Sequence, residues 1–470
     1  MTAQNHNPDS ISHADDAVSL RSAFIRGVGW AGLARALAFV FSMFRYVVFA
    51  RLLDPREFGI AGAAAFAMGL LSALTSPSFG QALVQQDDDV EPYLDTVFTT
   101  GIARALILTL VMIAAAHPLA AFFKQPDDYR VFWALAPFMI IYAMQSPGVV
   151  VYYRRLDFRI AFALNAAELA TAFGVGLGAI LYWHDWRGLV AGMLAGQVAR
   201  SAVTHWYFSY RPRLRFDLSK ARRMFGFGRW VTGQQLASYV ARRIDSLAVA
   251  HLLGPGALGE YQMAFRAGEL PAGEFAMSMG LVAFPLSARL RGRPRERRRA
   301  FAAICAIVFA AGAAYAAIMF LWGADIVRFA FGPRWLGALA PLQLLALYGL
   351  FQGLQAVGGY FLDGMGAPKA SFQVTTVRAL TLAALVFPMT LWGGTRGTAA
   401  AGLISVILPL PLMFALFRRA QILDAVDAGN RAAAHASSVN GKAPAARAGA
   451  GASALTADTV APLSAGVEER

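Results

Sequence analysis

Long apolar runs, each long enough to cross a lipid bilayer, follow one another along most of this chain. About 20 apolar residues in a helix span a hydrocarbon core of roughly 30 Å. A backbone in lipid must satisfy its own hydrogen bonds, and these runs are too long for barrel strands, so they predict helices. Only 15% of the residues are charged, against about 25% in soluble proteins. We therefore expect an all-α, polytopic membrane protein with about 12 transmembrane helices. The runs lie at residues 24–50, 58–84, 94–122, 131–153, 158–183, 187–209, 224–252, 259–288, 300–322, 335–362, 370–392 and 397–417.

Polar stretches divide the chain into five predicted parts. The N-terminal stretch lacks the basic start and short apolar core of a cleaved secretion signal, so we expect it to stay on the protein. The last stretch is rich in Ala, Gly and Ser and too poor in large apolar groups to repay the entropy of ordering. The parts are a polar cytoplasmic N-terminus (1–23), an N-lobe of helices one to six (24–209), a basic cytoplasmic linker (210–223), a C-lobe of helices seven to twelve (224–418) and a disordered cytoplasmic tail (419–470).

Lysine and arginine gather in alternate connections between the runs. The most basic connections are residues 154–159, 211–223 and 289–299. Because basic loops are retained in the cytoplasm, we expect both termini there. The same loops account for most of the net charge of +14, so we expect a membrane and not a nucleic acid as the partner of these charges.

The segment ARLLDPREFG at residues 50–59 recurs 200 positions later as AHLLGPGALG at residues 250–259. Each copy follows the first run of a six-run unit. Six spans is an even number, so we expect two like-oriented lobes related by a pseudo-two-fold axis along the membrane normal. Proline stops a helix and glycine allows close packing, which predicts a tight outer-face turn of architectural value. The turn residues are Pro55, Gly59, Pro255 and Gly259.

Prolines also interrupt the second run of each unit. Pro77 lies in LTSPSFG and Pro271 in GELPAGE. Paired breaks of this kind point to a transport pathway at the interface between the lobes, although either one alone is equally well explained as a packing kink.

Charged residues inside apolar runs cost about 2.5 to 3.5 kcal/mol on insertion scales and usually face a cavity or a partner. Arginine dominates them here, and its guanidinium matches phosphate oxygens two at a time. We therefore predict a cationic cavity for an anion such as phosphate or pyrophosphate. Arg26, Arg51, Arg104 and Arg229 lie near the ends of runs, where they can snorkel to the surface. Arg200 and Arg378 also lie in runs, and the deeper or clustered candidates for substrate binding are Arg35, Arg45, Arg242, Arg243 and Arg266.

Three acids inside the runs are candidates for ion coupling, namely Glu168, Asp245 and Glu269. Glu168 has no obvious local partner, which favours an acid that releases a proton or a cation. Asp245 stands three residues after Arg242, so a salt bridge across one helical turn is an equal alternative for it.

Motifs that hold cofactors do not occur in the sequence. Cys305 is the only cysteine, which excludes an intrachain disulfide and argues against a cysteine metal site. GVGWAG at residues 27–32 fits G-x-G-x-x-G, but it lies within the first run and follows no strand. The sequence has no Walker motif, no H-E-x-x-H and no nucleophile elbow. We expect no cofactor, no metal and no direct use of ATP.

Residues 47–85, VVFARLLDPREFGIAGAAAFAMGLLSALTSPSFGQALVQ, resemble the opening of the polysaccharide flippase family within the multidrug/oligosaccharidyl-lipid/polysaccharide exporter superfamily. The turn Leu-Leu-x-Pro-x-x-Phe-Gly and a second run that ends in Gly-x-Ala-Leu-Val carry the likeness, which extends in outline over residues 24–418.

This resemblance implies a bacterial inner-membrane transporter that flips a polyprenyl-pyrophosphate-linked oligosaccharide for exopolysaccharide, O-antigen or capsule assembly. It implies alternating access between two lobes, with helices one and seven beside a V-shaped cavity, arginines on the pyrophosphate and an ion gradient for drive. A polysaccharide polymerase and export machinery are the partners it suggests.

Two other functions fit a membrane protein of this kind. A cation-coupled multidrug exporter shares the architecture, but its binding lobe should hold an excess of acids. A membrane polymerase or ligase would need an outer-face platform, whereas the longest predicted outer loop has only about a dozen residues.

Overall fold

The computed structural model describes residues 39–75, 91–149, 158–208, 210–217, 236 and 238–423. Throughout these ranges the backbone forms helices, turns and loops, without a strand. The all-α prediction is confirmed for this part of the chain.

The described helices fall into a set before residue 217 and a set after residue 236. The first set has helical residues 39–52, α2 (Pro55–Thr75), α4 (Glu91–Ala114), α5 (Ala116–Phe122), the 3-10 helix η1 (Pro126–Asp128), α6 (Arg130–Leu135), α7 (Pro137–Ala143), α9 (Phe158–Trp183) and α10 (Trp186–Tyr207). The second set has helical residues 238–253, α12 (Pro255–Gly268), α13 (Leu270–Arg289), α14 (Pro294–Leu321), α15 (Gly323–Ala330), the 3-10 helix η2 (Pro333–Ala338), α16 (Leu339–Gly364), α17 (Pro368–Ile407) and helical residues 410–423.

Glycine permits one sharp change of direction inside α17. Gly394 has a φ of 58° and a ψ of −141°, a conformation that strains any residue with a side chain. The kink falls between the predicted runs 370–392 and 397–417, where the sequence indicates a break.

Several helices are long and apolar enough to cross a bilayer. Their outward faces carry exposed apolar side chains, as on α4, where Ile107 is 61% and Leu110 is 65% exposed. Such faces suit lipid, so the protein is a multi-pass membrane protein. The six candidate spans within the described residues are Pro55–Leu74, Tyr93–Ala114, Phe162–Trp183, Pro294–Leu321, Pro333–Gly364 and Pro368–Leu423.

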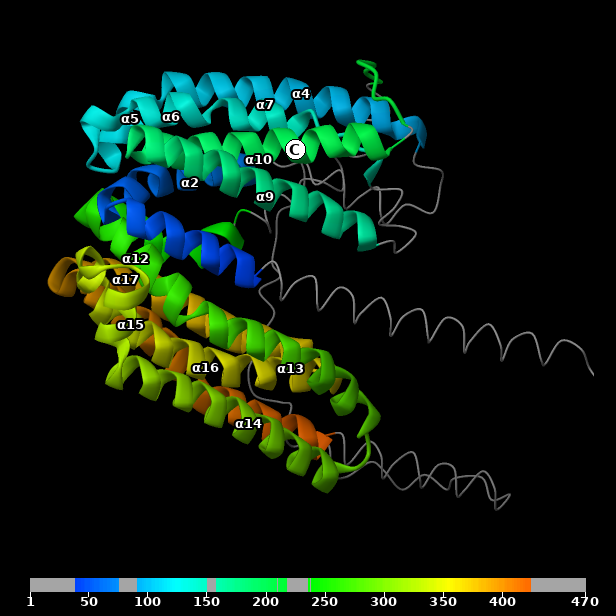
Figure 1. The fold of residues 1–470 in the computed structure, drawn as a ribbon. Coiled ribbons are helices and arrows are strands. Elements are labelled where there is room, and N and C mark those ends of the chain that lie inside the picture. The colour runs from blue at the N-terminus through cyan, green and yellow to red at the C-terminus, as the bar shows by residue number, and fades with distance from the viewer. Residues whose placement is uncertain are drawn as a thin grey trace, which may run out of the picture.

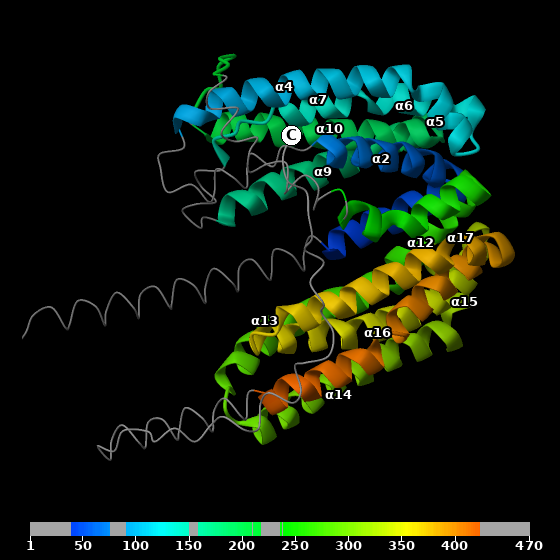
Figure 2. The same cartoon turned by 180° about the vertical axis from the view of Figure 1, so that it is seen from behind.

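Helices from the same part of the sequence lie together (Figure 1). The helices up to α10 form one group, here the first group, and those from residue 238 onward form the second group. The two groups approach each other near the starts of α2 and α12 and spread apart toward the opposite end, as the view from behind also shows (Figure 2).

The recurring segment forms the junction between the two groups. Pro55 is the first residue of α2, and Pro255 is the first residue of α12. A Cβ on Gly59 would lie 1.6 Å from the carbonyl oxygen of Pro255, and a Cβ on Gly259 would lie 1.8 Å from that of Pro55. No side chain fits at either position, so the backbones of the two helices touch. The sequence pattern indicated two turns, but it gave no sign that each copy packs on the other.

The interruption predicted at Pro271 is present but slight. α12 ends at Gly268 and α13 begins at Leu270, with Pro271 in its first turn. Glu269 between them keeps helical torsion angles, with φ −92° and ψ −44°, so the chain bends without unwinding. Pro77 lies outside the described residues.

We expect Gly59→Ala to destabilise the protein, because the new Cβ would overlap the Pro255 carbonyl and force α2 away from α12. Overpacking of this kind costs about 1–3 kcal/mol. Gly101→Ala is the matched control, since a Cβ at Gly101 in α4 meets nothing within 4 Å and alanine favours a helix. The measurement is the thermal unfolding midpoint of each purified protein in detergent. Equal midpoints for the two variants would contradict the close crossing.

Candidate functional site

A cavity of about 450 Å³ lies between the two groups of helices. Residues of α2 form its wall on the side of the first group, and none of them is charged. The helix over residues 238–253, together with α12, α16 and α17, forms the rest of the wall. Four guanidinium groups against two carboxyl groups give the cavity an excess of donors suited to an anion. The charged lining residues are Arg242, Arg243, Arg266, Arg378, Asp245 and Glu269.

The structure brings three of the five predicted arginines to this cavity. Arg242, Arg243 and Arg266 line its wall. Arg45, on the helix over residues 39–52, does not line it but lies within electrostatic range of Arg266. Arg35 lies outside the described residues. The cluster of positive charge therefore draws on both groups of helices.

An aromatic ring from the first group supports Arg266. The guanidinium carbon of Arg266 lies 5.0 Å from the centre of the Tyr46 ring, within the range of cation–π attraction. Tyr46 is buried, with 9% of its surface exposed. A cation–π contact of this kind is not a conventional hydrogen bond, so it leaves the guanidinium able to donate to a ligand.

Arg378 lines the cavity, although its position in the sequence gave no reason to prefer it. Its Nη2 donates to the Tyr348 hydroxyl at 2.6 Å, and its Nη1 donates to Oε1 of Gln355 at 3.4 Å. Both partners lie on α16, so Arg378 links the neighbouring helix α17 to it. In the sequence, Arg378 is only a lone charge within an apolar run. Its partners lie 30 and 23 residues away, so the sequence does not show that they meet it.

The two cavity acids are buried among other polar groups. Asp245 is 9% exposed, and its Oδ2 accepts a hydrogen bond from the Tyr261 hydroxyl at 2.8 Å. Its Oδ1 accepts from the backbone N–H of Ser246 at 2.7 Å. No ion pair within the described part of the chain joins Asp245 to Arg242, so the salt bridge weighed from the sequence is not formed. Glu269 is 7% exposed and lines the same wall.

Glu168 lies away from the cavity wall and has a partner that the sequence did not reveal. Its Oε2 accepts from Nη1 of Arg200 at 2.9 Å, across from α9 to α10. The same Nη1 donates to Oδ1 of Asn165 at 2.7 Å. Arg200 follows Glu168 by 32 residues, so only the packing of the two helices brings them together. Glu168 also lies within electrostatic range of Arg45.

Side-chain hydrogen bonds join the two groups around the crossing of α2 and α12. They are partly reciprocal, since residues 51 and 251, one in each copy of the recurring segment, both contact a backbone carbonyl of the opposite group. These contacts hold the groups together at this end of the molecule. They are Arg51 Nε to Ala330 O at 2.9 Å, Lys124 Nζ to Leu252 O at 2.7 Å, Arg334 Nη1 to Asp54 Oδ1 at 2.9 Å, Trp335 Nε1 to Ala50 O at 2.8 Å and His251 Nδ1 to Phe122 O at 2.9 Å.

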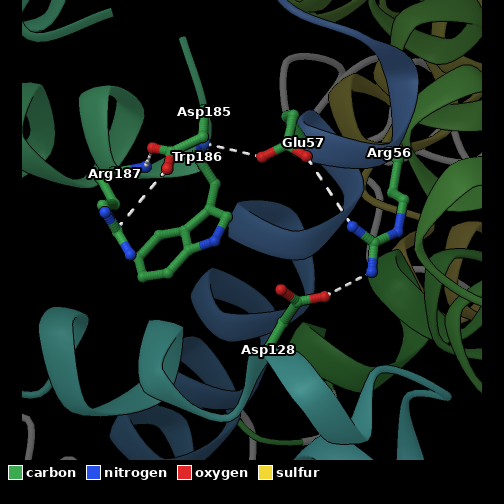
Figure 3. Close-up of polar contacts among 6 residues, drawn as sticks. All are labelled: Arg56, Glu57, Asp128, Asp185, Trp186 and Arg187. Atoms are coloured by element: carbon green, nitrogen blue, oxygen red, sulfur yellow. Dashed lines mark hydrogen bonds and ion pairs between the residues drawn. The ribbon is translucent and has the colours of Figure 1, made fainter. Parts of the chain in front are cut away.

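A polar network fixes the start of α2 within the first group (Figure 3). Oε2 of Glu57 accepts from the backbone N–H of Trp186 at 2.8 Å, at the N-terminus of α10, where the helix dipole favours a carboxylate. Nη2 of Arg56 lies 2.6 Å from Oδ2 of Asp128 in η1. The start of α2, and with it the crossing glycine, is therefore tied to two neighbouring elements.

Residues 48–340 match the family model described as "Polysaccharide biosynthesis protein". The chain belongs to this family. The resemblance inferred from residues 47–85 is thereby confirmed. One similar protein is the lipopolysaccharide biosynthesis protein WzxC of Escherichia coli K12. It is 20% identical over 393 residues, which cover 83% of this chain and 78% of WzxC. The succinoglycan biosynthesis transport protein ExoT of Rhizobium meliloti is 25% identical over 364 residues, which cover 76% of this chain and 72% of ExoT.

This family member also matches a solved structure. The lipid II flippase MurJ, in an inward closed conformation, has a TM-score of 0.69 to this chain. The match covers 84% of this chain and 90% of the MurJ chain at 15% identity. At that identity the likeness shows the fold, and the fold is the one seen in MurJ.

We expect Trp335→Phe to loosen the junction between the groups, because it keeps an aromatic ring but leaves the Ala50 carbonyl without its donor, at a cost of about 1–3 kcal/mol. The readout is the reaction of Ala65→Cys in the cavity wall with an impermeant thiol reagent, in a chain that carries Cys305→Ser. The reagent is added on the side of the recurring segment, and the rate should rise severalfold.

Trp392→Phe serves as the control, since Trp392 is 92% exposed and is not buried in the junction as Trp335 is. If both tryptophan variants react at the rate of the parent, the bond to Ala50 does not hold this end closed.

Proposed function

We propose that this protein is a flippase that carries a polyprenyl-pyrophosphate-linked oligosaccharide across the bacterial inner membrane for surface polysaccharide synthesis. The observation that carries the proposal is the cavity between the two groups of helices, lined by four arginines. Membership of the polysaccharide biosynthesis family supports the substrate class. ExoT is named as a transport protein and MurJ as a lipid II flippase, which supports a transporter and not an enzyme.

The proposed role of the arginines follows from the cost of moving a pyrophosphate through lipid. An isolated charge in a medium of low dielectric is strongly disfavoured, and a matched ion pair lowers that cost. Arg266 and Arg378 hold fixed positions beside Tyr46 and Tyr348, so their guanidinium groups are ordered before the ligand arrives. Arg242 and Arg243 are exposed on the same wall and supply further donors.

The proposed architecture is twelve transmembrane helices in two six-helix lobes, residues 24–209 and 224–418, related by a pseudo-two-fold axis along the membrane normal. The reciprocal packing of Gly59 on Pro255 and of Gly259 on Pro55 supports such an axis. The N-terminus (1–23), the linker (210–223) and the tail (419–470) are cytoplasmic in this proposal, as the basic connections suggest.

Alternating access follows from this orientation. The crossing of α2 and α12 is then at the outer face, and the groups spread apart toward the cytoplasm, which corresponds to a state that loads substrate from inside. Release outside requires the contacts around the crossing to break while the cytoplasmic ends of the groups approach each other.

Asp245 and Glu269 are the proposed ion-coupling acids. Both are buried in the wall that also carries the arginines, so a proton or cation taken up there would strengthen the hold on an anion, and its release would restore the negative charge and help the anion to leave. Glu168, paired with Arg200, is the proposed third acid, and its proximity to Arg45 gives it an electrostatic route to the same cluster.

We expect Arg266→Gln to lower the flipping rate by about tenfold to a hundredfold, since a hydrogen bond to a charged group is worth about 1.5–3 kcal/mol. The assay uses vesicles that contain the purified protein and a labelled lipid-linked oligosaccharide, and it follows the label between leaflets. Arg328→Gln is the control with the same change of charge, because Arg328 is exposed and lies outside the cavity.

Two results would contradict the proposed function. Lengthening of the glycan in these vesicles would indicate a polymerase or ligase. Export of a cationic dye that is unharmed by Arg266→Gln, without movement of the labelled lipid, would indicate a multidrug exporter.

A further inference from the structure

The turn between α13 and α14 carries a dense group of positive charges. Glu296 is the only acid in this stretch, and its contact with Arg293 is long, at 3.5 Å. Arg297 is buried and the other arginines are exposed. Within the described residues, no ion pair involves Arg289, Arg295, Arg298 or Arg299. The arginines of the turn are Arg289, Arg291, Arg293, Arg295, Arg297, Arg298 and Arg299.

Two further segments bring positive charge to the same face. The rings of Phe301 and Phe417 stack with their centres 4.2 Å apart, so the exposed Arg418 lies beside the first turns of α14. Nη2 of Arg291 lies 3.3 Å from the position that a Cβ on Gly366 would take, in the turn before α17. In Figures 1 and 2 the end of the last described helix lies beside the turn between α13 and α14. We call residues 289–299, Lys369, Arg418 and Arg419 the basic surface.

The basic surface lies just beyond the lipid-facing parts of its helices. Phe284 on α13 is 48% exposed, and Ile307 on α14 is 53% exposed. Ile307 follows Arg299 by eight residues, which is about 12 Å along a helix. Exposed apolar side chains at that distance place the guanidinium groups at the level of lipid headgroups.

We propose that the basic surface binds anionic phospholipid headgroups of the leaflet that it faces. Retention of a loop in the cytoplasm requires only an excess of positive charge. Several exposed guanidinium groups within one turn, with a single acid among them, can in addition bind phosphate oxygens in pairs. Each basic residue near an anionic leaflet strengthens binding about fivefold. The proposal rests on the proposed orientation, in which this face is cytoplasmic, but not on the transported substrate.

The test measures which phospholipids the full-length protein retains. Purified protein is equilibrated with mixed micelles of phosphatidylcholine and phosphatidylglycerol, and bound lipids are counted by native mass spectrometry. The variant with Arg289, Arg295, Arg298 and Arg299 changed to Gln should lose at least about tenfold of its bound phosphatidylglycerol and keep its phosphatidylcholine. The control variant removes the same charge from exposed residues at the other end of the molecule, with Gln at Arg130, Arg187, Arg328 and Arg396.

Two further arms keep the test independent of any folding defect. Changing the same four residues to Lys should preserve most of the retention, because the charge remains. High salt should strip phosphatidylglycerol from the unmodified protein, since the Debye length falls to about 3 Å at 1 M. The proposal is overturned if the Gln variant retains phosphatidylglycerol like its parent, or if the control variant loses it equally. Flipping of the labelled oligosaccharide by the Gln variant is a separate readout, because the basic surface is not part of the cavity.

Discussion

The direct contact between the backbones of α2 and α12 is the constraint on which the rest of the structure depends. Because Gly59 and Gly259 carry no side chain, each helix begins against the other's first residue. One turn further on, Gly62 and Gln262 already line the cavity, so the crossing sets where the space between the groups begins. The polar network at Glu57 fixes the direction in which α2 leaves this point. Cavity, junction and spread of the helices are therefore consequences of one close approach.

Tyrosines stabilise much of the charge inside this membrane protein. Arg266 rests on the Tyr46 ring, and Arg378 is bonded to Tyr348, while the Asp245 carboxyl accepts from Tyr261. A phenol satisfies a charged group without cancelling its charge, whereas the pair of Glu168 and Arg200 is neutral as a unit. Charge that is supported but not cancelled remains available to a ligand, which distinguishes the cavity arginines from Arg200, whose charge is balanced by Glu168.

The sequence predicts features that the membrane or the local chain imposes. Lipid requires long apolar helices, so the described helices overlap the predicted runs, and the kink at Gly394 falls where two runs were separated. Arg242 and Arg243 were found because they are neighbours on one helix. The partners of Arg378 and Glu168 were not found, since they lie 23 to 32 residues away and meet only through the angle at which helices pack. The pairing of the two recurring segments was missed for the same reason, because a repeat shows likeness and not contact.

The cavity wall has a consequence for how such proteins diversify. Every charged side chain that lines it, within the described residues, comes after position 236, while α2 contributes only uncharged surface. The two groups of helices thus differ in the charge that they bring to the cavity, and under the proposed function cargo preference would depend mainly on the second group. Exchange of gene segments between relatives would then be expected to transmit specificity with that portion, while the earlier portion is shared.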